Sequence, residues 1–201
     1  MRILITGTPG TGKSSVAREI SKRKGWPLLS LKEVAERHRC IIRKEGKEKI
    51  VDTAKLRKAT LRELKGKEDA VVEGHLGCEF SLPVDFVFVL RTHPSELRKR
   101  MRRRRYPRKK IEENLMAEML DYCTQVSKRH YRVPVLEADT TGRDARQTAT
   151  RILSYLENEE GRVRRTLKLG RGCSPPRFGK KVNKLDNASW EKELRKAVLH
   201  L

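Results

Sequence analysis

A hydrophobic run leads directly into a glycine-rich turn near the start of the chain. Residues 2–6 (RILIT) are β-branched or aliphatic after the first position, and residues 7–14 (GTPGTGKS) match the pattern G-x-x-x-x-G-K-S/T. Residues 13–24 then carry apolar side chains at helical spacing. Glycines let backbone N–H groups approach phosphate oxygens, and a helix N-terminus favours anions. The segment therefore predicts a phosphate-binding loop (P-loop) in an α/β domain.

Two side chains of this loop have specific expected roles. Lys13 would contact the β- and γ-phosphates of a nucleoside triphosphate, and the Ser14 hydroxyl would ligate Mg²⁺. A chance match in a glycine-rich turn is the alternative, but a strand before the turn and a helix after it argue against that. The expected cofactors are ATP and Mg²⁺.

The rest of the pattern alternates strands with helices. We expect strands at 27–31, 69–73, 84–90 and 133–138, and helices at 32–39, 53–65, 94–105, 107–130 and 144–157. The run 84–90 (VDFVFVL) is apolar almost throughout, as in a parallel strand that is covered on both faces. The predicted fold is α/β, a doubly wound parallel sheet.

The chain is strongly basic. It has 201 residues with 48 Lys and Arg against 26 Asp and Glu, for a formal net charge of +22. Either this is a thermophile-like charged surface or the excess binds a polyanion such as RNA in a salt-dependent manner. From Gly161 onward the alternating pattern fails, and only 188–199 could form another helix. We therefore divide the chain into a core at 1–160 and a basic C-terminal extension at 161–201.

The four cysteines are far apart in sequence and form no C-x-x-C pair. Cys40, Cys78, Cys123 and Cys173 therefore predict neither a zinc site nor a disulfide framework, but free thiols in a reducing compartment. The start of the chain does not resemble a signal peptide, and no apolar run approaches the roughly 20 residues that span a bilayer. The expected localisation is cytoplasmic, without a membrane partner.

An acidic residue and a histidine follow the third predicted strand. Because parallel strands place ligands at their carboxyl ends, Glu73 and His75 should lie beside the P-loop. A carboxylate there would orient the waters around Mg²⁺. His75 could instead be an ordinary loop histidine that bonds to backbone.

Residues 98–110 (RKRMRRRRYPRKK) are the most basic stretch. They could be a solvated helix face or a localisation-like patch. They could also form a lid that closes Arg104 or Arg105 over the transferring phosphoryl group, where one arginine can raise the rate roughly 10³-fold or more. The stretch holds more cations than one active site needs, so the others would bind something larger. Arg91, at a strand end, is a further candidate for a phosphate contact.

Four segments together carry a family resemblance: GTPGTGKS, VVEGHLG, DFVFVLRT and RRYPRKKIEENLMAEML. They resemble the adenylate kinase 6 family, small adenylate-kinase-like ATPases of archaea and eukaryotes implicated in late maturation of the small ribosomal subunit. The resemblance covers about residues 1–157. It implies a P-loop kinase core with a nucleoside monophosphate (NMP) binding segment at about 30–53 and a short lid at about 103–113 that lacks zinc-binding cysteines.

The resemblance also implies roles for single residues. The ATP phosphates would be held by Gly10, Gly12, Lys13, Ser14 and Ser15. The lid would place Arg104 on ATP, and Arg143 would lie beside the adenine. Glu73 and His75 match the family's acidic-x-His element, in which many members carry Asp; Glu73 would act with Ser14 at the metal.

Three functions fit these features. The first is a reversible NMP kinase, ATP + AMP ⇌ 2 ADP, acting on AMP or another NMP and also hydrolysing ATP. The second is an ATPase switch that acts in ribosome assembly, bound to ribosomal RNA or a small-subunit ribosomal protein, with His75 orienting the attacking water. The third is a nucleoside or small-metabolite kinase, in which Asp52 or Glu73 would be the base.

Overall fold

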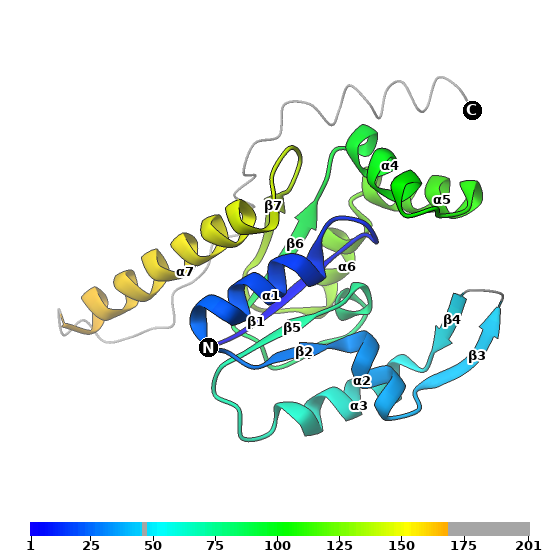
Figure 1. The fold of residues 1–201 in the computed structure, drawn as a ribbon. Helices are drawn as coiled ribbons and strands as arrows, with labels where there is room; N and C mark the ends of the chain where they lie inside the picture. The colour runs from blue at the N-terminus through cyan, green and yellow to red at the C-terminus, as the bar shows by residue number, and fades with distance from the viewer. Residues whose placement is uncertain (46–47, 169–201) are drawn as a thin grey trace.

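The computed structural model of the chain describes residues 1–45 and 48–168 (Figure 1). Its centre is a five-stranded sheet in the order β2-β5-β1-β6-β7, in which every neighbouring pair is parallel. The strands are β1 (Arg2–Gly7), β2 (Leu28–Ser30), β5 (Ala70–Glu73), β6 (Phe86–Arg91) and β7 (Val135–Asp139). The predicted parallel sheet is confirmed.

Helices cover both faces of this sheet. Helices α1 (Lys13–Lys24) and α7 (Ala145–Lys168) pack on one face, and α2 (Leu31–Arg37), α3 (Thr53–Leu64) and α6 (Tyr122–His130) contribute to the core on the other. The 3₁₀-helix η1 (His75–Cys78) follows β5 on that second face. Among the described residues, no helix combines the length and apolar character needed to cross a membrane.

The alternation of β1 explains this double covering. Ile3 and Ile5 belong to the core beneath α1 and α7, whereas Leu4 belongs to the opposite core, and all three are fully buried. Burying a side chain of this size contributes about 1.5–3 kcal/mol. The strand is therefore held in the middle of the sheet, where its carboxyl end meets those of β5 and β6.

Two helices project beyond the carboxyl ends of the strands (Figure 1). They are α4 (Pro94–Arg103) and α5 (Arg108–Met119), and we call them together the basic arm. The arm has a small core of its own, in which Leu97 and Met101 of α4 pack against Ile111 and Leu115 of α5. The predicted lid lies at the turn between these helices.

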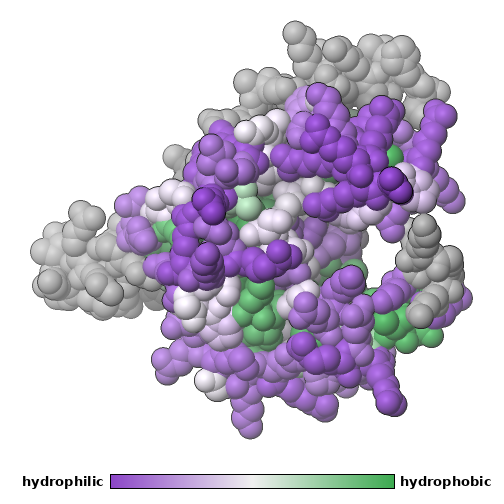
Figure 2. Space-filling view, viewed as in Figure 1, coloured by the Kyte–Doolittle hydropathy of each residue, from purple (hydrophilic) through white to green (hydrophobic). Residues whose placement is uncertain are grey.

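A hairpin occupies part of the stretch between the helices predicted at 32–39 and 53–65, for which no strand was predicted. Strands β3 (Ile41–Glu45) and β4 (Glu48–Val51) pair antiparallel, with Ile41 opposite Val51 and Glu45 opposite Glu48. The prediction was wrong because Lys and Glu dominate the centre and the apolar residues lie only at the ends. The hairpin and the arm project on opposite sides of a hollow in the molecular outline (Figures 1 and 2).

The helix predicted at 107–130 is two helices. Helix α5 ends at Met119, and Asp121 takes a left-handed conformation with φ 55° before α6 begins. Aspartate tolerates this region better than most residues. The break matters for the site, because it turns Cys123 into the main core while Leu115 stays in the arm.

Helix α7 is longer than predicted. It continues past residue 157 and through Gly161 to Lys168. A helical glycine costs about 1 kcal/mol relative to alanine, and the arginines, leucine and lysine that follow are good helix formers. The helix thus crosses the predicted boundary at residue 160, so that division of the chain stays a prediction. The possible helix at 188–199 lies outside the described residues.

Candidate nucleotide-binding site

The P-loop joins the carboxyl end of β1 to α1, at the centre of the sheet (Figure 1). Gly7 and Gly10 adopt φ of 137° and 97°, which favour glycine. A Cβ on Gly7 would lie 2.4 Å from the Leu90 carbonyl oxygen, and one on Gly10 would lie 2.8 Å from Leu97 Cδ1. The loop is therefore wedged against β6 on one side and against α4 on the other.

The N-terminus of α1 carries no internal anion. Its N-cap residue, Gly12, offers no side-chain cap, and the first turn holds no acidic residue. Ser15, which is exposed, uses its backbone N–H on the Gly12 carbonyl at 3.1 Å. The remaining N–H groups and the helix dipole favour a negatively charged ligand at this end.

Lys13 lies almost fully buried at this helix end. Its Nζ donates to the Thr8 carbonyl at 2.9 Å, and its side chain is 9% exposed. Burial lowers the pKa of Lys13, while the nearby Cys123, Glu73 and Glu118 oppose that shift. An anionic phosphate would supply the compensating charge that this ammonium lacks.

Glu73 connects three elements at the end of β5. Its Oε2 accepts from Ser14 Oγ at 3.2 Å, and its Oε1 accepts from Ser30 Oγ at 2.8 Å. Glu73 as a whole residue is 7% exposed. A hydroxyl and a carboxylate this close are oxygen donors of the kind that Mg²⁺ takes, so Ser14 and Glu73 fit a magnesium site.

His75 is fixed to the first residue of the P-loop. Its Nδ1 donates to the Gly7 carbonyl at 3.1 Å, since that oxygen can only accept. Its own carbonyl accepts from Thr6 Oγ1 at 3.1 Å. The backbone bond expected of an ordinary loop histidine is present, and it also places the ring beside the phosphate-binding loop.

The structure does not bring the two predicted arginines to the P-loop. Arg104 caps the C-terminus of α4 and is exposed, and no hydrogen bond within the described part of the chain joins its side chain to the loop. Arg143 follows β7, and its Nη1 donates to Asp139 Oδ2 at 2.9 Å. Their contacts with ATP stay predictions that require movement of the arm or arrival of the ligand.

Arg91 belongs to a buried ion network that sequence reasoning missed. Its Nε lies 2.9 Å from Glu118 Oε1 and its Nη1 lies 2.6 Å from Glu137 Oε1. Glu118 also accepts from the hydroxyl of Thr8 in the P-loop. Although burial alone would lower the pKa of Arg91, these carboxylates raise it. Burial raises the pKa of Glu118, and Arg91 opposes that shift.

The guanidinium of Arg91 is thus engaged by carboxylates in place of the phosphate suggested by its strand-end position. The network instead connects the P-loop to α5, because Glu118 of α5 accepts a hydrogen bond from Thr8 of the loop. One signal was available in the sequence: Glu118 follows Ile111 and Leu115 at helical spacing, on the buried stripe of α5.

The free thiols that the cysteine spacing predicted are confirmed for Cys40, Cys78 and Cys123. Two of these thiols and an imidazole nevertheless meet beside the P-loop, which the spacing did not predict. The side chains of His75, Cys78 and Cys123 offer ligand atoms that all lie within 4.8 Å of one another. The neighbouring Cys78 thiol, His75 and Lys13 lower the pKa of Cys123, against the effect of burial. Cys173 lies outside the described residues.

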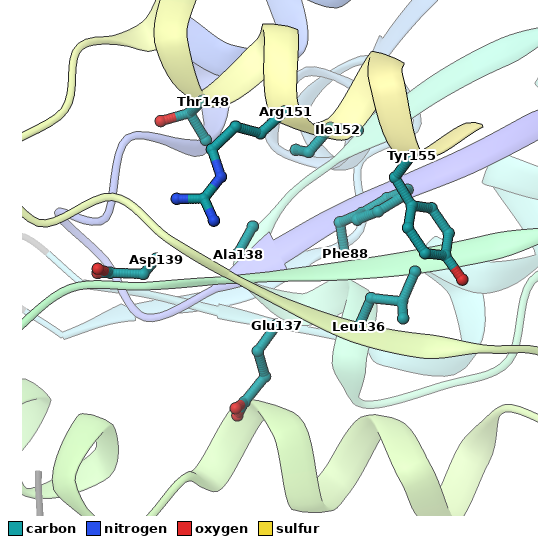
Figure 3. A pocket seen from close by; sticks show the side chains of 9 residues that line it. All are labelled: Phe88, Leu136, Glu137, Ala138, Asp139, Thr148, Arg151, Ile152 and Tyr155. Carbon is teal, nitrogen blue, oxygen red and sulfur yellow. The ribbon is translucent and has the colours of Figure 1, made fainter. Parts of the chain in front are cut away.

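A separate small cavity lies between α7 and the β7 edge of the sheet (Figure 3). Its volume of about 60 Å³ has room for only a few waters. Figure 3 shows Ile152 and Tyr155 reaching from α7 toward the strands. No P-loop residue lines it, so it is not the nucleotide site. The lining residues are Phe88, Leu136, Glu137, Ala138, Asp139, Thr148, Arg151, Ile152 and Tyr155.

Comparison of the sequence with known proteins identifies a matching family and several relatives. A family model described as an AAA domain matches residues 3–121. An Archaeoglobus fulgidus protein named "Putative adenylate kinase" is 42% identical over 141 residues, which is 70% of this chain and 74% of the relative. A Thermococcus onnurineus protein of the same name is 35% identical over 158 residues, 79% of this chain and 85% of the relative.

Solved structures share the fold at lower identity. Deoxyadenosine kinase from M. mycoides with bound dATP aligns with a TM-score of 0.53 and 18% identity, covering 78% of this chain and 100% of that one. Shikimate kinase from Bacteroides thetaiotaomicron aligns with a TM-score of 0.55 and 16% identity, covering 78% and 98%. These two likenesses concern the fold. With its curated relatives and its matched domain, the chain belongs to the adenylate-kinase-like family of P-loop proteins.

Proposed function

We propose that this protein is an NMP kinase that catalyses ATP + AMP ⇌ 2 ADP with Mg²⁺. The observation that carries the proposal is the convergence of Lys13, Ser14 and Glu73 at the carboxyl ends of β1 and β5, beside an uncapped helix N-terminus. The relatives named above as adenylate kinases support the choice of reaction.

The donor nucleotide would bind through the P-loop. Backbone N–H groups from Gly10 to Ser14 and the side chain of Ser15 would hold the phosphates, and Lys13 would move its ammonium from the Thr8 carbonyl to the β- and γ-phosphates. Ser14 and, through water, Glu73 would hold Mg²⁺, which neutralises developing charge on the phosphate oxygens. This chain's contribution to rate is then positioning and charge stabilisation.

The acceptor would bind in the hollow between the basic arm and the β3–β4 hairpin (Figure 2). The NMP-binding segment at 30–53 begins with Ser30, which donates to Glu73. That bond links the acceptor side to the magnesium side. An NMP phosphate is already an anionic nucleophile, so the site needs no strong general base.

The lid would complete the site. Arg104 lies at the turn of the arm, between α4 and α5, and is exposed. Closure of the arm would bring it to the transferring phosphoryl group, where an arginine can raise the reaction rate roughly 10³-fold or more. The contact between Gly10 and Leu97 would couple that closure to the P-loop.

The direct test is ADP production from ATP and Mg²⁺ with and without AMP, for the wild type and Lys13→Ala. We expect a large AMP-dependent rise that Lys13→Ala abolishes. Slow hydrolysis that is indifferent to AMP would contradict the kinase proposal and would leave an ATPase.

A second function is supported by the surface of the arm. The side chains of Arg102, Arg103, Arg104 and Arg105 are all exposed, and one active site cannot use four. An ATPase switch in maturation of the small ribosomal subunit would use them on ribosomal RNA, or on a small-subunit ribosomal protein, with His75 orienting the attacking water. Such binding should weaken steeply with salt, and salt-insensitive RNA binding would contradict it.

A further inference from the structure

The cluster of His75, Cys78 and Cys123 brings together elements that are distant in sequence. His75 begins η1 and Cys78 ends it, and Cys123 lies in the first turn of α6. The left-handed residue Asp121, which separates α5 from α6, allows α6 to pack on η1. The phosphoryl transfer proposed above uses neither cysteine.

Ordinary buried thiols behave as small hydrophobic side chains, and Cys40 is an internal example. It is 1% exposed, and its thiol donates to the His38 carbonyl at 3.7 Å. Cys78 and Cys123 are as deeply buried, at 0% and 3% exposed, but each contacts His75. Cys78 Sγ donates to the His75 carbonyl at 3.1 Å, and Cys123 Sγ lies 3.6 Å from His75 Nδ1.

We propose that His75, Cys78 and Cys123 form a binding site for a soft divalent metal ion of the Zn²⁺ type. Two sulfurs and an imidazole nitrogen are the ligands that zinc prefers, and three protein ligands leave one position open. This site is distinct from the magnesium site of Ser14 and Glu73, whose donors are oxygens.

The dimensions suit such an ion. With Zn–S near 2.3 Å and Zn–N near 2.0–2.1 Å, tetrahedral ligand atoms lie roughly 3.5–3.8 Å apart. The Cys123 Sγ to His75 Nδ1 distance of 3.6 Å already falls there. The remaining separations are at most 4.8 Å, so each must contract by no more than about 1.3 Å. Rotation of buried side chains can supply that much.

The charges also balance. Binding displaces any proton that the two thiols still carry, and the resulting pair of thiolates neutralises the divalent ion beside the Lys13 ammonium. A metal on Nδ1 also takes the place of the proton that now bonds the Gly7 carbonyl, and the ring proton moves to Nε2. Occupancy of the site is therefore coupled to the first residue of the P-loop.

Cobalt(II) is the probe, because thiolate coordination gives it near-ultraviolet charge-transfer absorption and a tetrahedral site intensifies its visible bands. The full-length chain would carry Cys173→Ser throughout and be kept reduced with a phosphine. We expect one Co²⁺ per chain with both spectral features, displacement by Zn²⁺, and persistence in excess Mg²⁺. Absence of the charge-transfer band, or displacement by Mg²⁺, would overturn the proposal.

Single variants assign the ligands. Zn²⁺ affinity, measured against a chromogenic chelator, should fall by at least about 10–100-fold in Cys78→Ser and in Cys123→Ser, since loss of a supporting group alone has that effect. The matched control, Cys40→Ser, removes an equally buried thiol and should bind as the parent does. Equal affinity in all three variants would overturn the proposal.

Thermal unfolding distinguishes a variant that has lost the metal site from one that fails to fold. Zn²⁺ should raise the Tm of the parent and of Cys40→Ser, by an amount that grows with the logarithm of the ratio of Zn²⁺ concentration to Kd. At the same Zn²⁺ concentration the rise should be much smaller in folded Cys78→Ser and Cys123→Ser. If Zn²⁺ did not raise the Tm of the parent, the proposal would fail whatever the variants did.

Discussion

At the scale of single residues, the site depends on a few short-range polar contacts around one carboxylate. Glu73 receives Ser14 on one oxygen and Ser30 on the other, and it lies within electrostatic reach of Lys13. Ser14 and Lys13 come from α1, and Ser30 comes from β2. A change at Glu73 should therefore affect metal binding directly, whereas a change at Ser30 should affect only its orientation.

This difference gives a first prediction. Glu73→Gln should raise the Mg²⁺ concentration needed for half-maximal ADP formation, because the amide keeps the shape of the side chain and loses its charge. We expect a loss of roughly 10²–10³-fold in kcat, the size seen when one aligned electrostatic group is removed. Ser30→Ala, which removes only the bond to Oε1, should lose about tenfold. Equal losses would contradict the separate roles.

Lys13 gives a prediction about pH. Because burial lowers its pKa, its charge should be lost as pH rises while still below the ordinary value for lysine. ATP affinity measured by calorimetry between about pH 8 and 10 should then fall with pH, while Lys13→Ala binds weakly throughout. The folded state binds fewer protons here than the unfolded chain does, so this residue makes stability rise with pH over the same window. ATP affinity that stayed constant across the window would contradict the shift.

At the scale of elements, the P-loop and α4 meet at one crowded point. The missing Cβ of Gly10 faces Leu97 and Met101, which also form the core of the basic arm. Glu118 makes a second connection, from α5 to Thr8. The arm is thus packed and hydrogen-bonded to the loop that would hold ATP.

Gly10→Ala tests this contact between the P-loop and α4, with Gly25→Ala as its matched control. Both glycines have positive φ, 97° and 69°, and the Cβ of Gly25 meets nothing within 4 Å. Both variants should lose about 1–2 kcal/mol of stability from backbone strain. Only Gly10→Ala should also weaken ATP binding, by roughly tenfold or more, because its Cβ displaces Leu97. An equal fall in ATP affinity in Gly25→Ala and Gly10→Ala would contradict this explanation.

The strands and most helices were predictable because their cause is local. The apolar run at 84–90 and the glycine-rich motif specify β6 and the P-loop almost without reference to the rest of the chain. The hairpin at 41–51 was missed because cross-strand pairing, and not alternating hydrophobicity, holds it together. The helix break at Asp121 was missed because nothing in the local pattern distinguishes one long helix from two.

The site was predictable only in part, for a related reason. Glu73 and His75 were placed correctly beside the P-loop because the ends of parallel strands share one edge of the sheet. The meeting of Cys78 with Cys123, and of Arg91 with Glu118, depends on where the fold places α5 and α6. Sequence spacing carries no information about such contacts.

At the scale of the whole molecule, the chain carries far more positive charge than the proposed nucleotide site would use. In the P-loop, Lys13 is the cationic side chain that would contact the ATP phosphates, together with backbone N–H groups, yet the chain carries a formal net charge of +22. Much of the surface over α4 and α5 is strongly hydrophilic (Figure 2). A polyanion would be held by many exposed cations at once, and ATP by a few buried groups.

A salt titration separates the two. Lys99→Ala and Arg102→Ala, both exposed on α4 and outside the predicted lid at 103–113, should each reduce the slope of log K against log salt for RNA by about 0.7–0.9 for every phosphate that the side chain neutralises. Neither change should alter ATP affinity, because neither residue contacts the P-loop in the described structure. An unchanged slope would contradict RNA binding by the arm.

The fate of the γ-phosphate tests the central proposal most directly. The protein would be given ATP labelled at the γ-phosphate, with Mg²⁺ and AMP, and the products separated by chromatography. A kinase built as described predicts that the label appears in ADP, at a rate that rises with AMP and vanishes in Lys13→Ala. Label that appears only as inorganic phosphate, whatever the AMP concentration, would contradict phosphoryl transfer to a nucleotide.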